Sequence, residues 1–396
     1  MKIFVLNCGS SSVKYKLYEM ETETVLADGK VERIGQENAQ ITHQSMNHGE
    51  IEKTMPIYEH TVAISESLNL LVHPEVGVID SLDEITGVGH RVLHGGEYFK
   101  ESVLVSDKEL ALMDELRELG PLHMPANITG IRACQKIMPG TPQVAVFDTA
   151  FHSTMPKRAY LYAIPYDLYE RYRVRKYGFH GTSHKYIAGR VGQLMGKDPA
   201  ELKVISCHLG NGASIAAIDG GISVDTSMGF TPLEGLMMGT RSGDIDPAAL
   251  DFIMEKENVP MSNINSMLNK HSGLYGIAGV SDMRDIEKGV LEGDKMCQIA
   301  FDMYEYRIRK YIGGYVAAMG GVDAIVFTAG IGENTPSLRS KLCESLSYLG
   351  ITLDEERNQT RGQDIEISTP DSKVKVFIIP TDEEVVIARD TAAIIG

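Results

Sequence analysis

The sequence predicts two related α/β domains, each opening with a meander of three strands and continuing with alternating helices and strands. Three observations support this prediction. A strand–turn–strand pattern over residues 3–18 recurs over residues 204–218, with a small, polar, glycine-containing turn in both copies. Helical and strand patterns alternate after each copy, which is typical of α/β domains. Finally, 396 residues are too many for one ordinary core, so two domains are expected.

The first half of the chain alternates apolar and polar residues before its helical segments begin. We expect strands at 2–7, 13–19, 25–34 and 39–44, a helix at 61–72, a short strand leading to Gly87–Arg91, helices at 107–119 and 125–137, and a buried strand at 144–147. Pro125 suits a helix start because proline fits the first turn. Residues 151–176 are irregular and rich in Tyr, so we place a domain boundary near residue 150.

The second half repeats this order. We expect strands at 203–208, 213–219 and 222–225, several helices of which the longest lies near 293–319, a strand at 323–328 leading to Gly330–Gly332, a helix after Asn334–Pro336, a strand at 374–379 and a last helix from about 383. The repeated order predicts that the two domains are duplicates.

Composition and charge limit the classes of function. The net charge of −16 argues against partners that attract basic proteins, namely nucleic acid and anionic membrane surfaces. It does not argue against phosphate, because a few local cations can dominate a cleft. Five cysteines without metal spacing predict a reduced compartment and no disulfide framework. The first apolar run ends at Asn7, and no run approaches 18 residues, so we expect a cytoplasmic protein.

The two repeated turns are candidate phosphate sites. The segments from Asn7 to Lys14 and from His208 to Ser214 expose backbone N–H groups and hydroxyls without bulky side chains. Taken alone, the first turn is more simply a hairpin whose serines satisfy its own backbone. The second copy shifts the balance towards phosphate binding. Lys14 is either a solvated strand residue or a charge directed at that phosphate.

Two further glycine-containing segments differ in how well they fit a ligand-binding site. The segment Thr328–Asn334 follows an apolar strand, where α/β sheets bind ligands, and it lacks the dinucleotide fingerprint of glycines. A helix-capping turn explains it about equally well. The segment Gly192–Asp198 resembles a P-loop only superficially, because its glycines are one residue too close and Asp198 replaces Ser or Thr. We interpret it as a helix end.

Two arginines and one aspartate are candidates for chemistry. Arg91 and Arg241 lie among small residues, which lets a guanidinium group reach a carboxylate or phosphate with two hydrogen bonds. An ion pair with Asp244 is the plainer alternative for Arg241. Asp148 ends a buried strand and is either a turn cap or a catalytic carboxylate.

Two pairs of histidines and one pair of glutamates each allow a structural and a functional interpretation. His90 with His94, and His180 with His184, have the spacing of a metal pair, but flanking glycines make a continuous helix doubtful, so hydrogen bonding is the favoured role. His180 precedes a helix and is a candidate charge donor. The acidic pair Glu383 and Glu384 fits a helix N-terminus, where the dipole stabilises acids, and also fits a Mg²⁺ ligand.

Seven segments, in this order, resemble the acetokinase family of the acetate and sugar kinase/heat-shock chaperone/actin superfamily. They are Asn7–Ser12, Gly89–Val92, Phe147–His152, Tyr177–Thr182, His208–Gly212, Gly239–Arg241 and Thr328–Asn334. The similarity runs essentially end to end. It implies two duplicated actin-like (ribonuclease H-like) α/β domains with a cleft between them. Residues 1–150, joined by the C-terminal helix 385–396, would form the acyl-substrate side, and residues 151–384 would bind the nucleotide and form the dimer.

The resemblance also implies an activity and its binding residues. ATP and acetate would give ADP and acetyl phosphate by direct in-line transfer, in either direction, in a homodimer. The reaction would use Mg²⁺, for which Mn²⁺ could substitute. Asn7 and Glu383 would hold the metal, with Glu384 as the alternative to Glu383, and Lys14 would lie near the phosphates. The phosphate loop would be His208, Leu209, Gly210, Asn211 and Gly212, and the adenosine would lie among Asp282, Met283, Arg284, Gly330, Ile331, Gly332, Glu333 and Asn334.

The family's transfer residues map onto four positions. Arg91 would bind the acyl substrate, Asp148 would be the acid/base, and His180 and Arg241 would stabilise the transition state. However, carboxylic acids ionise near pH 4, so acetate has no proton to lose at neutral pH. We therefore hypothesise that Asp148 orients Arg91, Arg241 or a metal-bound water.

The acyl pocket would draw on Leu93, Leu122, Phe179 and Pro232, and a residue as large as Leu93 favours acetate over propionate. Two alternatives stay open: a propionate or butyrate kinase, and an ATP switch like actin or the chaperones. The four transfer residues serve no purpose in binding ATP alone, which favours an enzyme.

Overall fold

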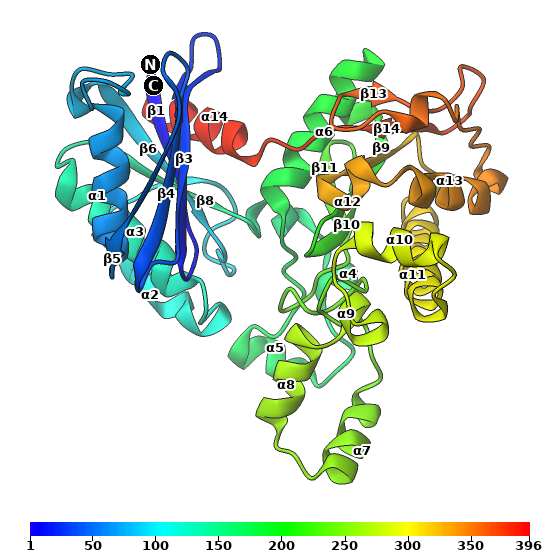
Figure 1. Ribbon diagram of the computed structural model, residues 1–396. Coiled ribbons are helices and arrows are strands. Elements are labelled where there is room, and N and C mark those ends of the chain that lie inside the picture. The colour runs from blue at the N-terminus through cyan, green and yellow to red at the C-terminus, as the bar shows by residue number, and fades with distance from the viewer. The chain divides into compact units, whose positions relative to one another are not determined.

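The computed structural model describes all residues 1–396 and divides the chain into two compact units (Figure 1). The first unit comprises residues 1–151 together with residues 382–396, and the second comprises residues 152–381. The last helix of the chain therefore belongs to the first unit.

The first unit is an eight-stranded sheet with helices on both faces (Figure 1). Its strands, in the spatial order β5-β4-β3-β2-β1-β6-β8-β7, are β1 (Lys2–Cys8), β2 (Ser12–Glu19), β3 (Thr24–Glu32), β4 (Gln36–Ser45), β5 (Gly49–Ile57), β6 (Ile85–Val92), β7 (Val103–Leu104) and β8 (Gln143–Phe147). Its helices are α1 (His60–Leu71), α2 (Asp107–Glu115), α3 (Met124–Ile137) and α14 (Glu383–Ile395).

Alternation along β1 gives this sheet its two packed faces. Phe4 and Leu6 join the core under α1 and α3, whereas the opposite face of the sheet packs on α14. Close approach of α14 depends on Gly89 in β6, since a Cβ there would lie 2.4 Å from Thr391 Oγ1 and 2.7 Å from Ile387. Glycine at this position therefore lets the last helix cover the middle of the first sheet.

The second unit is a six-stranded sheet with a larger set of helices. Its strands, in the order β11-β10-β9-β12-β14-β13, are β9 (Lys203–Leu209), β10 (Ala213–Asp219), β11 (Ile222–Thr226), β12 (Ala324–Thr328), β13 (Ile365–Glu366) and β14 (Lys375–Ile378). Its helices are α4 (Lys157–Tyr160), α5 (Tyr166–Tyr172), α6 (Gly181–Met195), α7 (Pro247–Glu257), α8 (Met261–Lys270), α9 (Gly273–Ala278), α10 (Met283–Leu291), α11 (Lys295–Met319), α12 (Ala329–Asn334) and α13 (Pro336–Ser345).

The two sheets share one topology, which confirms the predicted duplication. In both, the first strand pairs antiparallel with the second, β1 with β2 and β9 with β10. It also pairs parallel with a later strand, β6 or β12, which in turn pairs parallel with β8 or β14. The spatial orders β3-β2-β1-β6-β8 and β11-β10-β9-β12-β14 are equivalent. In both units, then, the first hairpin turn and the ends of the parallel strands fall on corresponding parts of the sheet.

The structure differs from the sequence prediction at several elements. The strands β5, β7 and β13 were not predicted, since two of them have only two residues and β5 is a mostly exposed edge strand. The irregular, Tyr-rich segment contains the short helices α4 and α5. The segment Gly330–Asn334, predicted as an open turn, lies in the helix α12. The predicted helix end at Gly196 is confirmed, because this residue caps α6 with φ of 62°.

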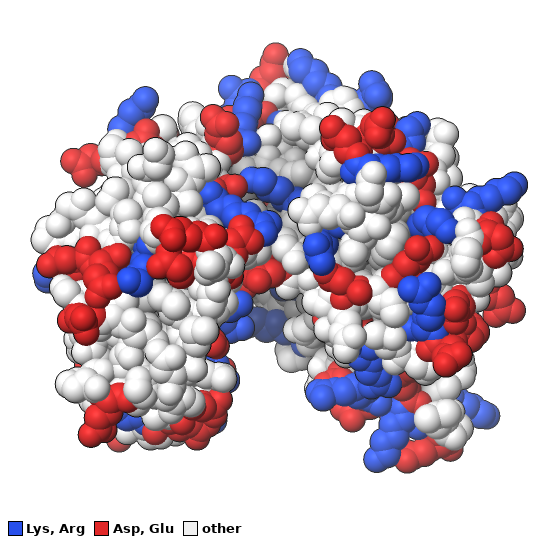
Figure 2. Space-filling view, turned by 90° about the horizontal axis from the view of Figure 1, so that it is seen from above, with Lys and Arg blue, Asp and Glu red and all other residues white.

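The state of the cysteines and the distribution of surface charges agree with the sequence composition. All five cysteines are free and buried. Acidic and basic side chains are interspersed over the face shown in Figure 2. None of the helices combines the length and apolar character that a membrane crossing requires.

Candidate functional site

In the first unit, Arg91 and Asp148 form a bidentate pair at the ends of β6 and β8. Arg91 Nε donates to Asp148 Oδ1 over 2.9 Å, and Arg91 NH2 donates to Oδ2 over 2.9 Å. The Asp148 side chain is only 2% exposed, whereas that of Arg91 is 26% exposed. The pair therefore holds the guanidinium plane in one orientation while leaving part of it accessible.

The electrostatics of this pair combine burial with charge. Burial raises the pKa of the Asp148 carboxyl above its ordinary value, and Arg91 opposes that rise. Burial disfavours the charged guanidinium, but Asp148 and Glu383 outweigh it and raise the pKa of Arg91. Arg91 is therefore a fixed positive charge beside a buried carboxylate.

The two glutamates at the start of α14 have different partners. Glu383 Oε2 lies 3.5 Å from Arg91 NH1, and its side chain is 16% exposed. Glu384 Oε2 instead lies 3.5 Å from Lys16 Nζ. Asp382 caps the helix by accepting from the Val385 N–H over 3.0 Å. This cap fixes the first turn of α14, so only Glu383 of the acidic pair is placed beside Arg91.

Asn7 and Lys14 lie at the same end of the sheet. They are direct partners in the antiparallel register of β1 and β2, so their side chains share a face. Leu6 pairs with His90 in the parallel register of β1 and β6, which places Asn7 next to Arg91 along the sheet. Asn7 is half-buried and Lys14 is exposed.

Asn127 of α3, which the sequence analysis did not single out, joins the ends of these strands. Its Nδ2 donates to the Cys8 carbonyl over 2.8 Å, and its Oδ1 accepts from the Leu93 N–H over 3.0 Å. Leu93 packs against the core under α2 and α3. Leu122, also predicted for the acyl pocket, is 72% exposed in the turn before α3. Asn127 therefore holds the strand ends that carry Asn7 and Arg91.

In the second unit, His180 occupies a left-handed position just before α6. Its φ is 55°, which is unusual for a residue with a Cβ and is often found at functional sites. The turn before His180 requires glycine at position 178, because φ there is 78° and a Cβ would lie 2.3 Å from Thr226. Phe179 is buried, and its carbonyl accepts from His152 Nε2 over 2.9 Å. This turn directs the His180 ring towards Gly212.

The predicted histidine roles at the spaced pairs are confirmed as hydrogen bonding. His90 Nε2 lies 2.7 Å from Gln143 Oε1. His180 Nδ1 and His184 Nε2 each lie 2.9 Å from Ser214 Oγ. His208 stacks on His180 with ring centroids 4.1 Å apart.

Arg241 lies in a loop that other residues hold in place. Its NH1 donates to the Pro232 carbonyl over 3.2 Å and lies 3.8 Å from Met238 Sδ, and no carboxylate acts on its pKa, so the alternative ion pair with Asp244 is wrong. Asp244 instead accepts from the Tyr311 hydroxyl over 2.6 Å and from the Gly235 N–H over 2.8 Å. Burial lowers the pKa of Arg241. Arg241 thus carries a positive charge that no carboxylate of the chain neutralises.

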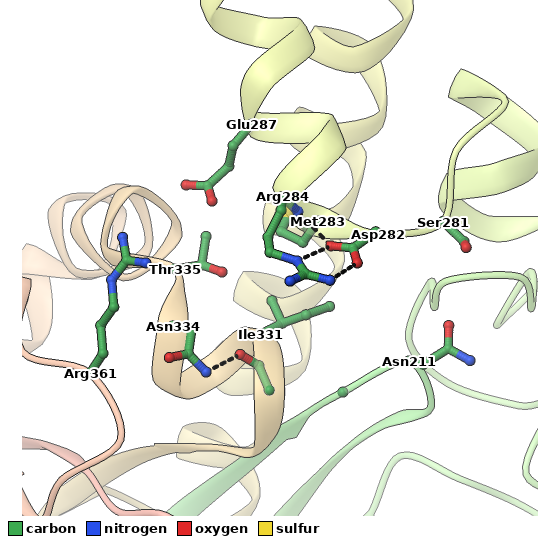
Figure 3. A pocket seen from close by; sticks show the side chains of 12 residues that line it. Asn211, Ser281, Asp282, Met283, Arg284, Glu287, Ile331, Asn334, Thr335 and Arg361 are labelled. Atoms are coloured by element: carbon green, nitrogen blue, oxygen red, sulfur yellow. Dashed lines mark hydrogen bonds and ion pairs between the residues drawn. The ribbon is translucent and has the colours of Figure 1, made fainter. Parts of the chain in front are cut away.

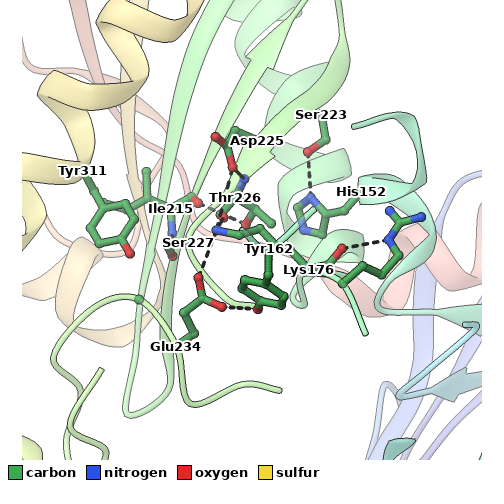
Figure 4. A network of polar contacts seen from close by, with 12 residues as sticks. His152, Tyr162, Lys176, Ile215, Ser223, Asp225, Thr226, Ser227, Glu234 and Tyr311 are labelled. Carbon is green, nitrogen blue, oxygen red and sulfur yellow. Dashed lines mark hydrogen bonds and ion pairs between the residues drawn. The ribbon is translucent and has the colours of Figure 1, made fainter. Parts of the chain in front are cut away.

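A polar network supports the same loop (Figure 4). Glu234 accepts from the Tyr162 hydroxyl and lies 3.3 Å from Lys176 Nζ. Lys176 also donates to the Thr226 carbonyl over 2.9 Å. Burial and Glu234 raise the pKa of Tyr162, which therefore stays a hydrogen-bond donor at neutral pH. The network ties the loop between Pro232 and Arg241 to the end of β11.

A cavity of about 660 Å³ lies on the second unit beside the hairpin turn of β9 and β10 (Figure 3). Eight predicted nucleotide residues line it: Gly210, Asn211, Asp282, Met283, Arg284, Gly330, Ile331 and Asn334. Four further residues line it that the sequence analysis missed: Ser281, Glu287, Thr335 and Arg361. Glu287 follows Met283 by one helical turn, a spacing that sequence reasoning could have used. Arg361 is distant from the other lining residues in sequence, so no spacing along the chain indicated it.

Other predicted nucleotide residues of the second unit do not line this cavity. Leu209 and Gly332 are buried, and Glu333 is half-buried. The Gly332 carbonyl accepts from Arg339 NH1 over 2.7 Å. His208 turns its ring towards His180 and Ser183.

Comparisons with known proteins agree over the whole chain. The sequence model of the acetokinase family matches residues 2–389. The acetate kinase of Halothermothrix orenii is 56% identical over 396 residues, which is all of both chains, and that of Thermotoga maritima is 55% identical over 400 residues, covering all of this chain and 99% of the other. The crystal structure of Porphyromonas gingivalis acetate kinase is 48% identical, with a TM-score of 0.96 over all of both chains.

A second similar structure is that of an enzyme with a different acyl substrate. The crystal structure of a propionate kinase from Francisella tularensis is 40% identical, with a TM-score of 0.92 over 99% of both chains. The duplicated sheets, the paired strand-end residues and the similarity over the full length lead to one classification. The chain belongs to the acetokinase family of phosphotransferases.

Proposed function

We propose that this chain transfers the γ-phosphoryl group of ATP to acetate, reversibly and with Mg²⁺, giving acetyl phosphate and ADP. The observation that carries this proposal is the identity of 56% to an acetate kinase over the whole length of both chains. The bidentate pair of Arg91 and Asp148 supports it, because a nucleotide switch needs no fixed arginine for a small carboxylate.

Phosphoryl transfer leaves little covalent work to the protein, so positioning and charge neutralisation dominate. We infer that Arg91 binds the acetate carboxylate, and that Arg241 and His180 contact the oxygens of the moving phosphoryl group. An arginine in this role is worth roughly 10³–10⁵ in rate. The absence of a carboxylate partner at Arg241 favours this role, since the charge is available to an anion.

Asp148 fits a positioning role better than a general base. It uses both carboxylate oxygens to hold Arg91, and acetate is already ionised at neutral pH. The alternatives, in which Asp148 orients Arg241 or a metal-bound water, have no contact of Asp148 in their favour. We therefore propose that Asp148 acts through Arg91.

The residues present fit a magnesium ion. Mg²⁺ prefers a few oxygen ligands and keeps several waters. Glu383 and Asn7 supply a carboxylate and an amide oxygen close to Arg91, whereas Glu384 is engaged by Lys16. We propose that Glu383 and Asn7 hold the ion, and that the residue Lys14 faces the phosphates from the neighbouring strand. Bound there, the ion would neutralise phosphate charge during transfer.

We propose that ATP or ADP binds in the cavity of Figure 3. The backbone of Gly210–Gly212 would face the phosphates, and Ile331 with Arg284 would enclose the adenosine. Arg284 is held by Asp282, which also caps α10. A cavity of about 660 Å³ is within the usual range for small-molecule sites.

Acetate is the preferred acyl substrate in this proposal, and propionate is the second candidate, favoured by the similarity to a propionate kinase. Leu93, Leu122, Phe179 and Pro232 would define the acyl pocket. Leu93 favours acetate because its side chain packs tightly against the chain at Gly120, leaving it little freedom to move aside.

We also propose a homodimer. Helix α11 presents an apolar stripe at helical spacing whose members are 38–50% exposed: Met296, Ile299, Met303 and Tyr306. Such a stripe is typical of helix pairing between subunits. Light scattering on a sizing column tests it, and a monomeric mass at working concentration would contradict the dimer.

One assay tests the central proposal. The protein is incubated with ATP, Mg²⁺ and hydroxylamine over a panel of short carboxylates, and acyl hydroxamate is measured. We expect the fastest product with acetate and slower product with propionate. Absence of product with every acid would favour an ATP switch instead.

A further inference from the structure

Ser214 of β10 connects two histidines through a single hydroxyl. Its Oγ lies 2.9 Å from His180 Nδ1 and 2.9 Å from His184 Nε2. At the other side of the His184 ring, Nδ1 lies 2.8 Å from Ser206 Oγ. Ser206, His184 and Ser214 are all fully buried. The three side chains therefore form a continuous buried hydrogen-bonded chain that ends at His180.

These three hydrogen-bonded side chains have only a few hydrogens to donate. Burial, with His152 and His208 nearby, lowers the pKa of His184 well below its ordinary value, so His184 is neutral and carries one ring hydrogen. Each serine hydroxyl has one hydrogen to donate. A hydroxyl between two ring nitrogens donates to one and accepts from the other, because accepting from both would leave its own hydrogen without an acceptor in a fully buried place.

Only two proton orders are compatible with these contacts. In the first, Ser206 donates to His184 Nδ1, His184 Nε2–H donates to Ser214, and Ser214 donates to His180 Nδ1. In the second, every direction is reversed, and the Ser206 hydroxyl hydrogen has no acceptor in a fully buried place. Because buried polar hydrogens are almost always paired, the first order is favoured.

We propose that Ser206, His184 and Ser214 are positioning residues that fix His180 as the neutral tautomer with its hydrogen on Nε2. This inference rests on the proposed function, in which His180 faces the moving phosphoryl group. In this order Nδ1 of His180 is an acceptor, so a neutral ring must carry its hydrogen on Nε2.

This tautomer matters for the proposed function because of where His180 Nε2 lies. A Cβ built on Gly212 would lie 3.8 Å from His180 Nε2 and 3.4 Å from Arg241 NH1. The Nε2 edge thus shares its surroundings with the unneutralised guanidinium and the glycine-rich turn. An N–H at this edge donates to a phosphoryl oxygen, whereas the opposite tautomer would present a lone pair and repel it.

The matched variants are Ser214→Ala and Ser183→Ala. The first removes the hydroxyl that touches His180, and the second removes a comparable buried hydroxyl, 2.8 Å from His208 Nδ1, in the same cluster. We expect Ser214→Ala to lower kcat by about one to two orders of magnitude, as for loss of a transition-state donor, with little change in the KM for ATP. Ser183→Ala should leave the His180 tautomer unchanged.

The direct readout is the ¹³Cδ2 chemical shift of selectively labelled histidine, which differs between the two neutral tautomers; loss of one signal in His180→Gln assigns it. We expect the wild-type signal to report the Nε2–H form and Ser214→Ala to report a mixture. An Nδ1–H form in the wild type, or an unchanged signal in Ser214→Ala, would overturn the inference.

Ser206→Ala keeps the test valid even if Ser214→Ala does not fold. Ser206 touches His184 and not His180, so the ordered hydrogen bonds predict a changed His180 signal in this variant as well. No change there would contradict the ordered chain. The tautomer is measured without turnover. A result that contradicts the proposed tautomer is therefore distinguishable from failure of the wild-type protein to make acetyl phosphate.

Discussion

Arg339 of α13 donates through NH1 to the backbone oxygen of Gly332 over 2.7 Å, and so connects two helices beside the candidate nucleotide cavity. The Arg339 side chain is fully buried and also donates to Asn358 Oδ1 and to the carbonyls of Asn358 and Thr360. The segment it holds leads directly to Arg361, which lines the cavity. One buried cation therefore fixes two walls of one site.

Replacing this cation should affect stability and nucleotide binding together. Arg339→Met leaves several buried oxygens without donors, each costing about 1–3 kcal/mol, so we expect the free energy of unfolding to fall by at least about 2 kcal/mol. The KM for ATP should rise more than the KM for acetate. Denaturant unfolding and steady-state kinetics measure both, and an equal rise of the two KM values would contradict the local role.

Asp148→Asn should lower turnover at every pH at which the enzyme is folded, because an amide cannot hold Arg91 with two charge-assisted bonds. In the wild type, burial raises the pKa of Asp148, so activity on the acid side should begin to fall at a higher pH than for a free aspartate. Turnover measured across pH tests both points. A loss in the variant that is confined to low pH and follows one carboxyl titration would rule out the positioning role.

The acidic pair at the start of α14 offers a matched comparison. Glu383→Gln should raise the Mg²⁺ concentration that gives half-maximal activity, because it removes the carboxylate beside Arg91. Glu384→Gln, whose partner is Lys16, should change it much less. Activity is measured against free Mg²⁺ for both variants. A larger shift in Glu384→Gln would assign the metal to that residue instead.

Trimming Leu93 should widen the acyl pocket. One methylene in such a pocket is worth about 1–3 kcal/mol, so Leu93→Ala should raise kcat/KM for propionate relative to acetate by about tenfold or more. Leu104→Ala, on the exposed strand β7, serves as the control. Preference for propionate in the wild type would contradict the assignment of Leu93.

His90 predicts part of the pH dependence of stability. Burial lowers its pKa from 6.5 to about 4 in the folded chain, although Gln143 opposes the shift. Between these values the unfolded chain binds more protons, so His90 contributes stability above pH 6.5 that is lost as the pH falls towards about 4. His90→Asn should give a flatter decline of the free energy of unfolding in this window, measured by denaturant titration. An unchanged slope would show that His90 does not contribute.

Much of the fold was predictable because it depends on local patterns. The buried strands β1, β9 and β12 are apolar runs bounded by turns, and their repetition revealed the duplication. The strands that escaped prediction are short or exposed, and so lack an apolar signal. The helix α12 escaped because two glycines interrupt a six-residue helix that follows a strand directly.

The candidate site was predictable where function leaves unusual residues in the sequence. Arg91 and Arg241 were singled out as charges among small neighbours, and Asp148 because it ends a buried strand; the structure then shows which groups they contact. Residues that act through others were missed. Ser214 is an ordinary strand serine until its two histidines are known, and Asn127 joins strands that are far from it in sequence.

The assignment of α14 to the first unit has a consequence for folding during synthesis. The helix comprises Glu383–Ile395, yet it covers the face of the sheet that Gly89 leaves open. A nascent chain can pair β1, β2 and β6 early, but one face of that sheet stays bare until Glu383–Ile395 have left the ribosome. The second unit, complete at residue 381, has its whole sequence available first. The half of the protein that is translated first is thus the last to be finished.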